Sequence, residues 1–362
     1  MLVYILMVIF SVIMLFVSEK FKKRKVISII AFVLSGVGFF LVSAIRYDLG
    51  TDYVRRYAKD YIKIGNGIDV KNLELGYKLL VRMCLLFSKD YVILFVITSG
   101  IIIFLTFYTI YKESPYPILS VLVYFLLGYF FHSLNIMREY IAISVLLFSY
   151  PYLIKKNYLV FVICSIIAFF FHSSSAIMLS AILLCNRNIF DLKRTLIFSL
   201  ILFIAGRYLW QHVGTYIISY TRFANYTKDT SKFSTGQLRK MDILINLALY
   251  LVICYLYKKS ADKGRKDNFL LNMQACALLF MISASAMSLF FRISFYFSIF
   301  NIISLPYFLK KCNLEKNKKI IVSIIIILIL TANFTKTNIL NNTDEVVPYK
   351  TIFSVEKRLK AK

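Results

Sequence analysis

The sequence lacks the motifs that mark several large classes of enzyme and transporter. It contains no Walker-type glycine–lysine loop, no nucleophile elbow and no zinc-ligand spacing. Asp48 and Asp52 are four residues apart, so their loop has no Asp-x-Asp pair to hold a metal–nucleotide complex. We therefore expect neither an ATP-driven pump nor a cytoplasmic sugar-nucleotide transferase, and we expect no cofactor and no metal.

Paired cysteines and a cleavable leader are also missing. The six cysteines have no paired spacing and mostly sit in apolar segments, where cysteine behaves as a small hydrophobic residue. The first apolar run, residues 1–18, is followed by its basic cluster instead of being preceded by it, and it has no small-residue cleavage site. We expect this run to be retained as a helix.

What the sequence does contain is long apolar runs. Apolar residues make up 59% of the 362 residues, and the mean hydropathy is +0.72. This composition predicts an all-α, polytopic integral membrane bundle. The net charge of +26 does not indicate nucleic-acid binding, because the basic residues are spread through loops and form no stripe with stacking aromatics.

The apolar runs predict about 10–12 transmembrane segments. They cover 1–18, 26–45, 91–111, 116–134, 137–154, 158–185, 195–209, 241–257, 268–290, 293–309 and 319–335. Short connectors rich in Lys and Arg belong on the cytoplasmic side. Here these connectors are 19–25, 112–115, 155–156, 187–194, 258–266 and 310–319.

The run 158–185 cannot be a single span under this rule. One helix would place the connectors 258–266 and 310–319 outside, and it would be about 42 Å long against a bilayer core of roughly 30 Å. A break near His172 removes both conflicts and predicts a broken or re-entrant hairpin that lines a cavity.

The outer side then carries loops 46–90 and 206–240, short turns around 135–138 and 291–292, and the tail 336–362. Within the first loop, residues 73–88 are apolar at helical spacing, which predicts an amphipathic helix on the outer surface. No tandem repeat or low-complexity linker is visible, so we predict a single polytopic domain.

Three arginines fall at ends of predicted membrane helices on this outer side: Arg46, Arg138 and Arg292. A charge at such a position is costly unless it has a partner. The planar guanidinium fork suits phosphate. We predict that the three hold a phosphorylated molecule at the membrane boundary; ordinary snorkelling or loop-pinning arginines are the alternative.

Further polar residues accompany these arginines. Asp48, Asp52 and Tyr53 follow Arg46, and Asn135 precedes Arg138 as a predicted helix cap. The residues from His172 to Ser175 are polar but lie between apolar segments. Placing polar side chains in apolar surroundings costs free energy, which suggests that they have a role. A structural histidine is the alternative explanation.

At these residues the chain resembles the EpsG/Wzy-type family of bacterial exopolysaccharide, capsule and O-antigen polymerases. The resemblance spans roughly 45–350 and lies in Arg46 with Gly50–Tyr53, Asn135 with Met137–Arg138, Phe171–Ser173, Arg292 with Tyr296, and Pro348–Tyr349. Residue 139 is Glu where the family favours Gln.

The resemblance implies a multi-pass protein of the bacterial plasma (inner) membrane, with an architecture like that of GT-C glycosyltransferases. It would join undecaprenyl-diphosphate-linked repeat units by inverting, metal-independent glycosyl transfer at the outer face. The expected partners are the lipid-linked donor and acceptor, the bilayer, a flippase and a chain-length regulator.

This chemistry needs a general base and cations near the leaving diphosphate. Arg46, Arg138 and Arg292 are the candidates that would bind this diphosphate. His172 is the first candidate for the base, followed by Asp52 and Asp48, and Tyr53 and Asn135 are further substrate-binding candidates. Two alternative functions remain open. One is a transporter or flippase of a lipid-linked glycan, which should show inverted repeats. The other is a membrane acyltransferase that modifies an extracellular glycan.

Overall fold

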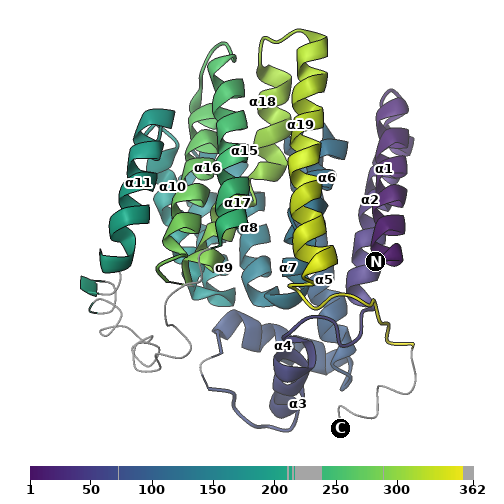
Figure 1. The fold of residues 1–362 in the computed structure, drawn as a ribbon. Helices are drawn as coiled ribbons and strands as arrows, with labels where there is room; N and C mark the ends of the chain where they lie inside the picture. Colours follow the sequence, from purple (N-terminus) through teal and green to yellow (C-terminus); the bar gives the residue numbers. More distant parts are fainter. Residues whose placement is uncertain (72, 210–211, 214–215, 217–238, 288, 354–362) are drawn as a thin grey trace. The chain divides into compact units, whose positions relative to one another are not determined.

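The protein is helical throughout the residues that the structure describes (Figure 1). This structure is a computed structural model, and it describes the chain except residues 72, 210–211, 214–215, 217–238, 288 and 354–362. The predicted outer loop 206–240 therefore lies largely outside the described residues. The all-α membrane fold expected from the apolar runs is confirmed.

Among the described residues, six helical segments are long and apolar enough to cross a membrane. They are α1 (Leu2–Lys20), α2 (Lys25–Ala44), α5 (Val92–Glu113), α15 (Lys240–Lys258), the α17–α18 segment (Leu289–Lys311) and the segment Lys316–Leu340, which contains α19 (Lys316–Phe334). The pair α6 (Pro117–Leu126) and α7 (Tyr129–Asn135) is bent by 52° and has the form of a broken span or a re-entrant loop. Left-handed Gly128, with φ of 76°, lies at this bend.

The remaining predicted runs also form helices, although these are shorter or more polar. They are α8 (Met137–Ile154), α9 (Tyr158–Phe171), α10 (Ala181–Leu184), α11 (Leu192–Leu209) and α16 (Arg265–Ser283). The break predicted near His172 is confirmed, because α9 ends there with the backbone of His172 extended. The second arm differs from a simple α-helix, since Ser173–Ser180 forms the 3-10 helix η2.

One predicted turn is wrong. Arg292 was expected in a turn at 291–292, but it lies inside α17 (Leu289–Ser298), and the chain breaks earlier, after Ser283. Arginine is a good helix former, whereas the serines at the break bond to nearby carbonyls. Ser283 donates to the Leu279 carbonyl at 2.9 Å, and Ser285 donates to the Ile282 carbonyl at 2.7 Å. A second break separates α17 from α18 (Asn301–Lys311).

The chain forms two compact units: residues 1–176 with 334–362, and residues 177–333. We call them unit 1 and unit 2. The single domain predicted from the sequence stays a prediction. In unit 1, α2 packs on α1 and α5, and α8 packs on α5 and α9. Its aromatic core includes Phe39, whose ring meets Phe130 edge to face with centroids 5.1 Å apart.

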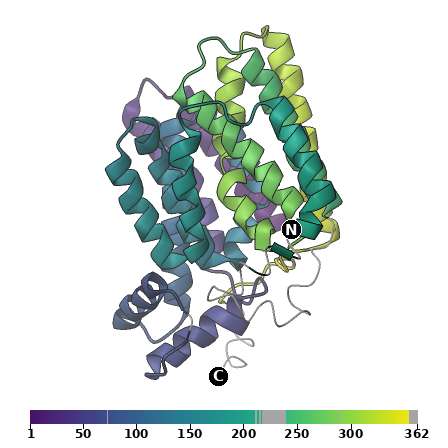
Figure 2. The same cartoon turned by 90° about the vertical axis from the view of Figure 1, so that its left-hand side faces the viewer.

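Four separate segments of unit 1 come together at one end. The Tyr4 hydroxyl, near the start of α1, donates to the Val346 carbonyl at 2.9 Å. The backbone amides of Tyr47 and Ile352 donate to the carbonyls of Lys350 and Ile45, both at 3.0 Å. This end also carries η1 (Tyr53–Ala58), α3 (Lys59–Gly65) and α4 (Leu75–Phe87) (Figure 2). The predicted outer elements of unit 1 are thus on a common side.

In unit 2 the three basic connectors also share one end. Asn272 of α16 donates to the carbonyls of Leu184 and Arg187 at 2.7 and 2.8 Å. The Asn313 amide donates to the Lys259 carbonyl at 2.9 Å. The parity argument, which places 187–194, 258–266 and 310–319 on one side, requires this arrangement.

Gly50 and Gly67 allow a matched test of how the first outer loop is held. Both glycines have positive φ, 89° and 77°, but a Cβ on Gly50 would overlap Asn135 Oδ1, whereas one on Gly67 would meet nothing within 4 Å. Strain alone costs about 1–3 kcal/mol. Gly50→Ala should therefore lower the thermal unfolding temperature in detergent by more than Gly67→Ala does. Equal effects of the two substitutions would contradict this packing.

Candidate functional site: a buried charge cluster in unit 1

Three helix ends of unit 1 meet in a cluster of titratable side chains. Arg138 and Glu139 lie in the first turn of α8, Glu74 is the residue before α4, and His172 follows the last residue of α9. A helix end leaves backbone groups exposed and brings polar side chains with it. The tertiary structure therefore gathers four such residues in an otherwise apolar bundle.

One ion pair and two longer contacts between titratable groups connect the four residues. Arg138 donates to Glu74 Oε2. His172 places Nδ1 3.4 Å from Glu74 Oε1 and Nε2 3.8 Å from Glu139 Oε2. The side chains of Glu139, Arg138 and Glu74 are only 2, 6 and 11% exposed, whereas that of His172 is 21% exposed. His172 is thus the member of the cluster that solvent or a substrate reaches most easily.

The electrostatics keep Glu74 ionised. Burial raises the pKa of its carboxyl, but hydrogen bonding with His172 and the charge of Arg138 outweigh burial, and the net pKa lies below its ordinary value. A carboxylate therefore faces each nitrogen of the His172 imidazole, Glu74 at Nδ1 and Glu139 at Nε2.

Close packing fixes the cluster in place. The ideal Cβ position on Gly76 lies 2.9 Å from the Phe170 carbonyl oxygen, so α4 approaches the end of α9 more closely than a larger residue would allow. Arg138 lies over the Tyr77 ring, 5.5 Å from its centroid. Glu74 and His172 are thereby held by neighbours on their own helices.

Arg46 lies outside this cluster and is enclosed, with 1% of its surface exposed. Its guanidinium donates to the Ser43 carbonyl and to Ser99 Oγ, and it lies 4.9 Å from the Phe95 ring centroid. Burial lowers its pKa to about 10, partly offset by nearby tyrosines that include Tyr53. The diphosphate role of Arg46 stays a prediction, and in this conformation internal partners occupy the guanidinium.

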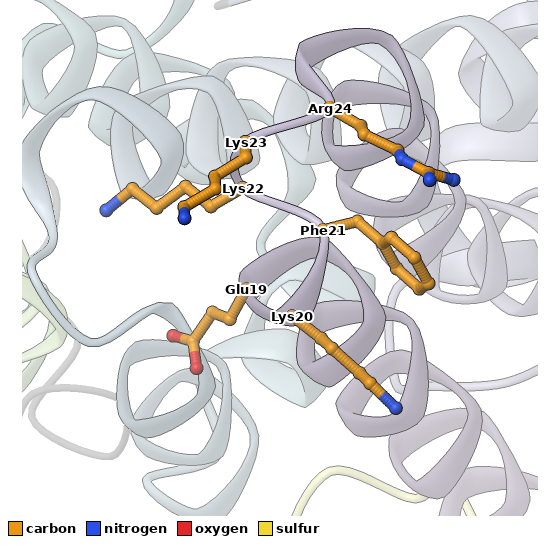
Figure 3. Close-up of a pocket in the computed structure, with 6 residues that line it drawn as sticks. All are labelled: Glu19, Lys20, Phe21, Lys22, Lys23 and Arg24. Carbon is orange, nitrogen blue, oxygen red and sulfur yellow. The ribbon is translucent and has the colours of Figure 1, made fainter.

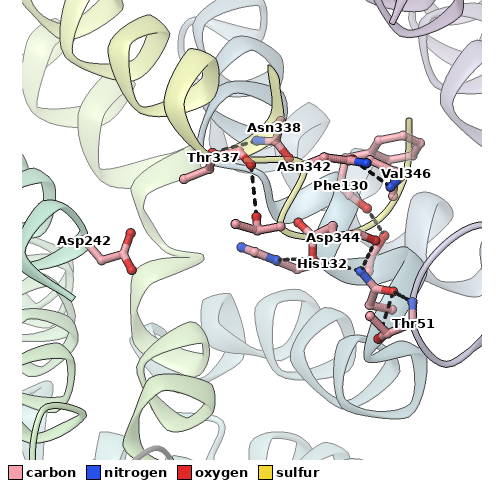
Figure 4. A network of polar contacts seen from close by, with 12 residues as sticks. Thr51, Phe130, His132, Asp242, Thr337, Asn338, Asn342, Asp344 and Val346 are labelled. Atoms are coloured by element: carbon pink, nitrogen blue, oxygen red, sulfur yellow. Dashed lines mark hydrogen bonds and ion pairs between the residues drawn. The ribbon is translucent and has the colours of Figure 1, made fainter. Parts of the chain in front are cut away.

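Asn135 joins the outer loop to the C-terminal segment (Figure 4). Its Oδ1 accepts from the Thr51 amide at 2.7 Å, and its Nδ2 donates to Asp344 Oδ1 at 2.8 Å. Asp344 Oδ1 also lies 3.1 Å from His132 Nδ1. The predicted capping role of Asn135 is wrong, because Ile136 holds the N-cap position of α8 and the Asn135 side chain is used in this network.

The three remaining loop candidates have different environments. Asp48 is exposed in a left-handed conformation with φ of 47°. Asp52, 25% exposed, lies 4.0 Å from Arg56. Tyr53 is fully buried, with its ring stacked on Phe95 at a centroid distance of 3.9 Å. Their predicted roles as base or sugar contact stay predictions.

Arg292 is exposed on α17 of unit 2. Its convergence with Arg46 and Arg138, which belong to unit 1, stays a prediction. Among the described residues no group of three or more His, Cys, Asp and Glu side chains could hold a metal ion.

Sequence reasoning missed Glu74 and Asp344 and did not foresee that Glu139 faces His172. Glu74 was visible only as an acidic residue beside the predicted amphipathic helix 73–88. Asp344 lies more than 200 positions from its partners His132 and Asn135. No local pattern could have paired these residues.

A surface hollow of about 520 Å³ lies at the connector between α1 and α2, lined by residues 19–24 (Figure 3). Lys22 and Lys23 extend to one side of the connector, whereas Lys20 and Arg24 extend to another. These basic groups diverge, so they do not converge on one ligand. The buried charge cluster is therefore the better candidate for the functional site.

The fold and this cluster define a polytopic helical membrane protein that gathers acid–base side chains at one end of a compact helical unit. The EpsG family model matches residues 29–351, most of the chain, and the chain belongs to the EpsG family. Membership implies a polymerase-like role in polysaccharide biosynthesis in a membrane. Neither the curated proteins nor the solved structures include a significant match.

The pKa of Glu74 leads to a prediction about stability and pH. Because its folded-state pKa lies below the ordinary value of 4.5, the ionised group adds stability that is complete above about pH 4.5 and is lost as the pH falls through the folded pKa. Glu74→Gln should therefore unfold at a lower temperature than the parent protein at neutral pH. The difference should shrink below pH 4.5.

Glu315→Gln is the matched control for this measurement. Glu315 is 76% exposed and pairs with Lys318 at 3.3 Å. Its substitution should change the unfolding temperature little at any pH. A Glu74→Gln difference that does not depend on pH would show that the carboxylate charge is unimportant to the cluster.

Proposed function

We propose that the protein is a polysaccharide polymerase that joins undecaprenyl-diphosphate-linked repeat units at the outer face of the bacterial plasma membrane. The observation that carries the proposal is the His172 imidazole held between Glu74 and Glu139 beside Arg138, in a member of the EpsG family. The product is exopolysaccharide or capsule. The lipid bilayer, the donor and acceptor glycolipids, a flippase and a chain-length regulator are its proposed partners.

The proposed reaction is a single displacement. An acceptor hydroxyl oxygen attacks the anomeric carbon of the donor glycan, and the bond from that carbon to the diphosphate oxygen breaks. Undecaprenyl diphosphate leaves with the bonding electron pair, and attack from the opposite side inverts the anomeric configuration. The hydroxyl proton passes to a general base.

His172 is the proposed base. Its exposure gives the acceptor hydroxyl access, and Glu74 and Glu139 stabilise the imidazolium that forms when the proton arrives. Asp52 and Asp48 are the second and third candidates. Both are on the outer loop and more exposed than Glu74 or Glu139, so substrate could reach them without rearrangement of the cluster.

Arg138 is the proposed primary contact of the leaving diphosphate. It lies beside His172 through their shared partner Glu74, and its buried Nε makes no hydrogen bond within the described part of the chain. Guanidinium groups can stabilise the developing phosphate charge without a metal. Arg46 and Arg292 are further proposed cations; Arg46 would exchange its serine partners for phosphate oxygens, whereas Arg292 is already exposed. Tyr53 and Asn135 are proposed to line the part of the site that binds the acceptor.

A deletion strain tests the polymerase function. Loss of a polymerase should leave single lipid-linked repeats at the outer face and no long glycan, because synthesis and export of the unit continue. Trapping of the repeats at the inner face would identify a transporter or flippase. Glycan of normal length that lacks only acyl groups would identify an acyltransferase.

Variants assayed with purified lipid-linked repeats test the residue roles. His172→Ala should lower turnover by about 10²-fold or more while donor binding persists, since general base catalysis contributes that much. Arg138→Lys should weaken donor binding and turnover, because lysine lacks the bidentate fork.

The matched controls are His212→Ala and Arg194→Lys, both exposed residues of unit 2. Each should retain the parent activity. Normal polymerisation by His172→Ala would make the histidine structural and pass the base role to Asp52 or Asp48. Full activity of Arg138→Lys would remove Arg138 from the diphosphate site.

A further inference from the structure

Helix α4 has apolar side chains on two faces, and only one face is covered by protein. Tyr77, Leu80, Val81 and Cys84 are buried against the rest of unit 1. A second row is exposed to between 49 and 84%: Leu75 56%, Leu79 49%, Met83 59%, Leu86 84% and Phe87 76%. We call this row the α4 stripe. Five large exposed apolar side chains on four turns of helix are more than a water-facing surface normally carries.

The α4 stripe continues an exposed apolar surface of the neighbouring helix α9. Gly76 borders the stripe and packs directly on the Phe170 backbone at the end of α9. There α9 exposes Phe169 and Phe170 to 45 and 43%, and along its length it exposes Ile163 and Ile166. One apolar surface therefore runs from the side of α9 onto the stripe.

Basic residues lie on the opposite edge of the stripe. At 3.6 residues per turn, Lys78 and Arg82 share one edge, and Gly76 with its α9 contact lies on the other. Arg82 is exposed, and Lys78 pairs with Asp69 at 2.7 Å. A helix with lipid on one side and cations at the edge away from the bundle has the charge pattern of an interfacial helix.

The direction of α4 agrees with this pattern. Within unit 1 it runs across the ends of α8 and α9 instead of parallel to them (Figures 1 and 2). Its position beside the last residues of α9 places it where a membrane-spanning helix would leave the apolar core.

We propose that the α4 stripe is embedded in the membrane interface, in contact with lipid. This contact would fix the depth of Glu74 relative to the bilayer. Glu74 is the N-cap of α4, and its carboxylate reaches Arg138 and His172. Contact between α4 and the bilayer therefore positions the charge cluster at the depth of the lipid headgroups. The partner is lipid, a class of contact that the proposed glycosyl transfer neither requires nor excludes.

Fluorescence quenching by brominated phosphatidylcholine tests this proposal. The sequence holds one tryptophan, so Trp210→Phe gives a background in which single tryptophans report position. Leu86→Trp and Met83→Trp probe the stripe, Ile163→Trp on α9 is the lipid-facing reference, and Lys71→Trp, an exposed loop position, is the water reference. The proteins are reconstituted in vesicles with bromine either near the headgroup or at the chain end.

In vesicles with bromine near the headgroup, the fluorescence of both stripe probes should be quenched to about the same extent as that of Ile163→Trp. They should lose less with bromine at the chain end, while Lys71→Trp loses little with either lipid. Quenching of both stripe probes no greater than that of Lys71→Trp would overturn the proposal, and a second protein copy or loop covering the stripe would give that result. The measurement needs no polymerase activity, so it can fail or succeed independently of the proposed function.

Discussion

The pairing of buried charges at the ends of α4, α8 and α9 is the constraint on which unit 1 depends. A carboxylate or guanidinium removed from water is tolerated only beside an opposite charge, and loss of one partner leaves the other uncompensated. Arg138 and Glu74 supply this compensation, and His172 connects Glu74 to Glu139. The helix α4 and the consecutive helices α8 and α9 must therefore have these ends at one place.

The C-terminal segment supplies a second set of hydrogen bonds at the same end of unit 1. Asp344, bound by Asn135, and the backbone pairing of residues 350–352 with 45–47 connect the two ends of the sequence. The loop with Asp48 and Asp52 is thus held between Asn135 and the C-terminal segment. Candidate catalytic groups on a loop gain precision from such anchoring, because a free loop would not keep them at a fixed distance from the helix ends.

The chemistry proposed for this EpsG-family protein uses groups that the fold already holds in place. Arg138 is oriented by its ion pair with Glu74, and the His172 imidazole lies between two carboxylates. Arg138 contacts Glu74 through Nη1, while its Nε makes no hydrogen bond within the described part of the chain. In the proposed reaction Arg138 can therefore keep Glu74 while it contacts the donor diphosphate.

The sequence by itself determined the helical membrane fold, nearly every helix, the break at His172 and the family, because hydropathy and Lys/Arg placement act locally and along the chain. It misplaced the turn at Arg292 and the cap at Asn135, where alternative local hydrogen bonds were equally available. Only the tertiary structure decided that Glu74 and Glu139 face His172, that Asp344 binds Asn135, and that Arg46 is enclosed. These contacts join residues far apart in sequence, and their energies depend on distance and burial, which no local pattern of residues encodes.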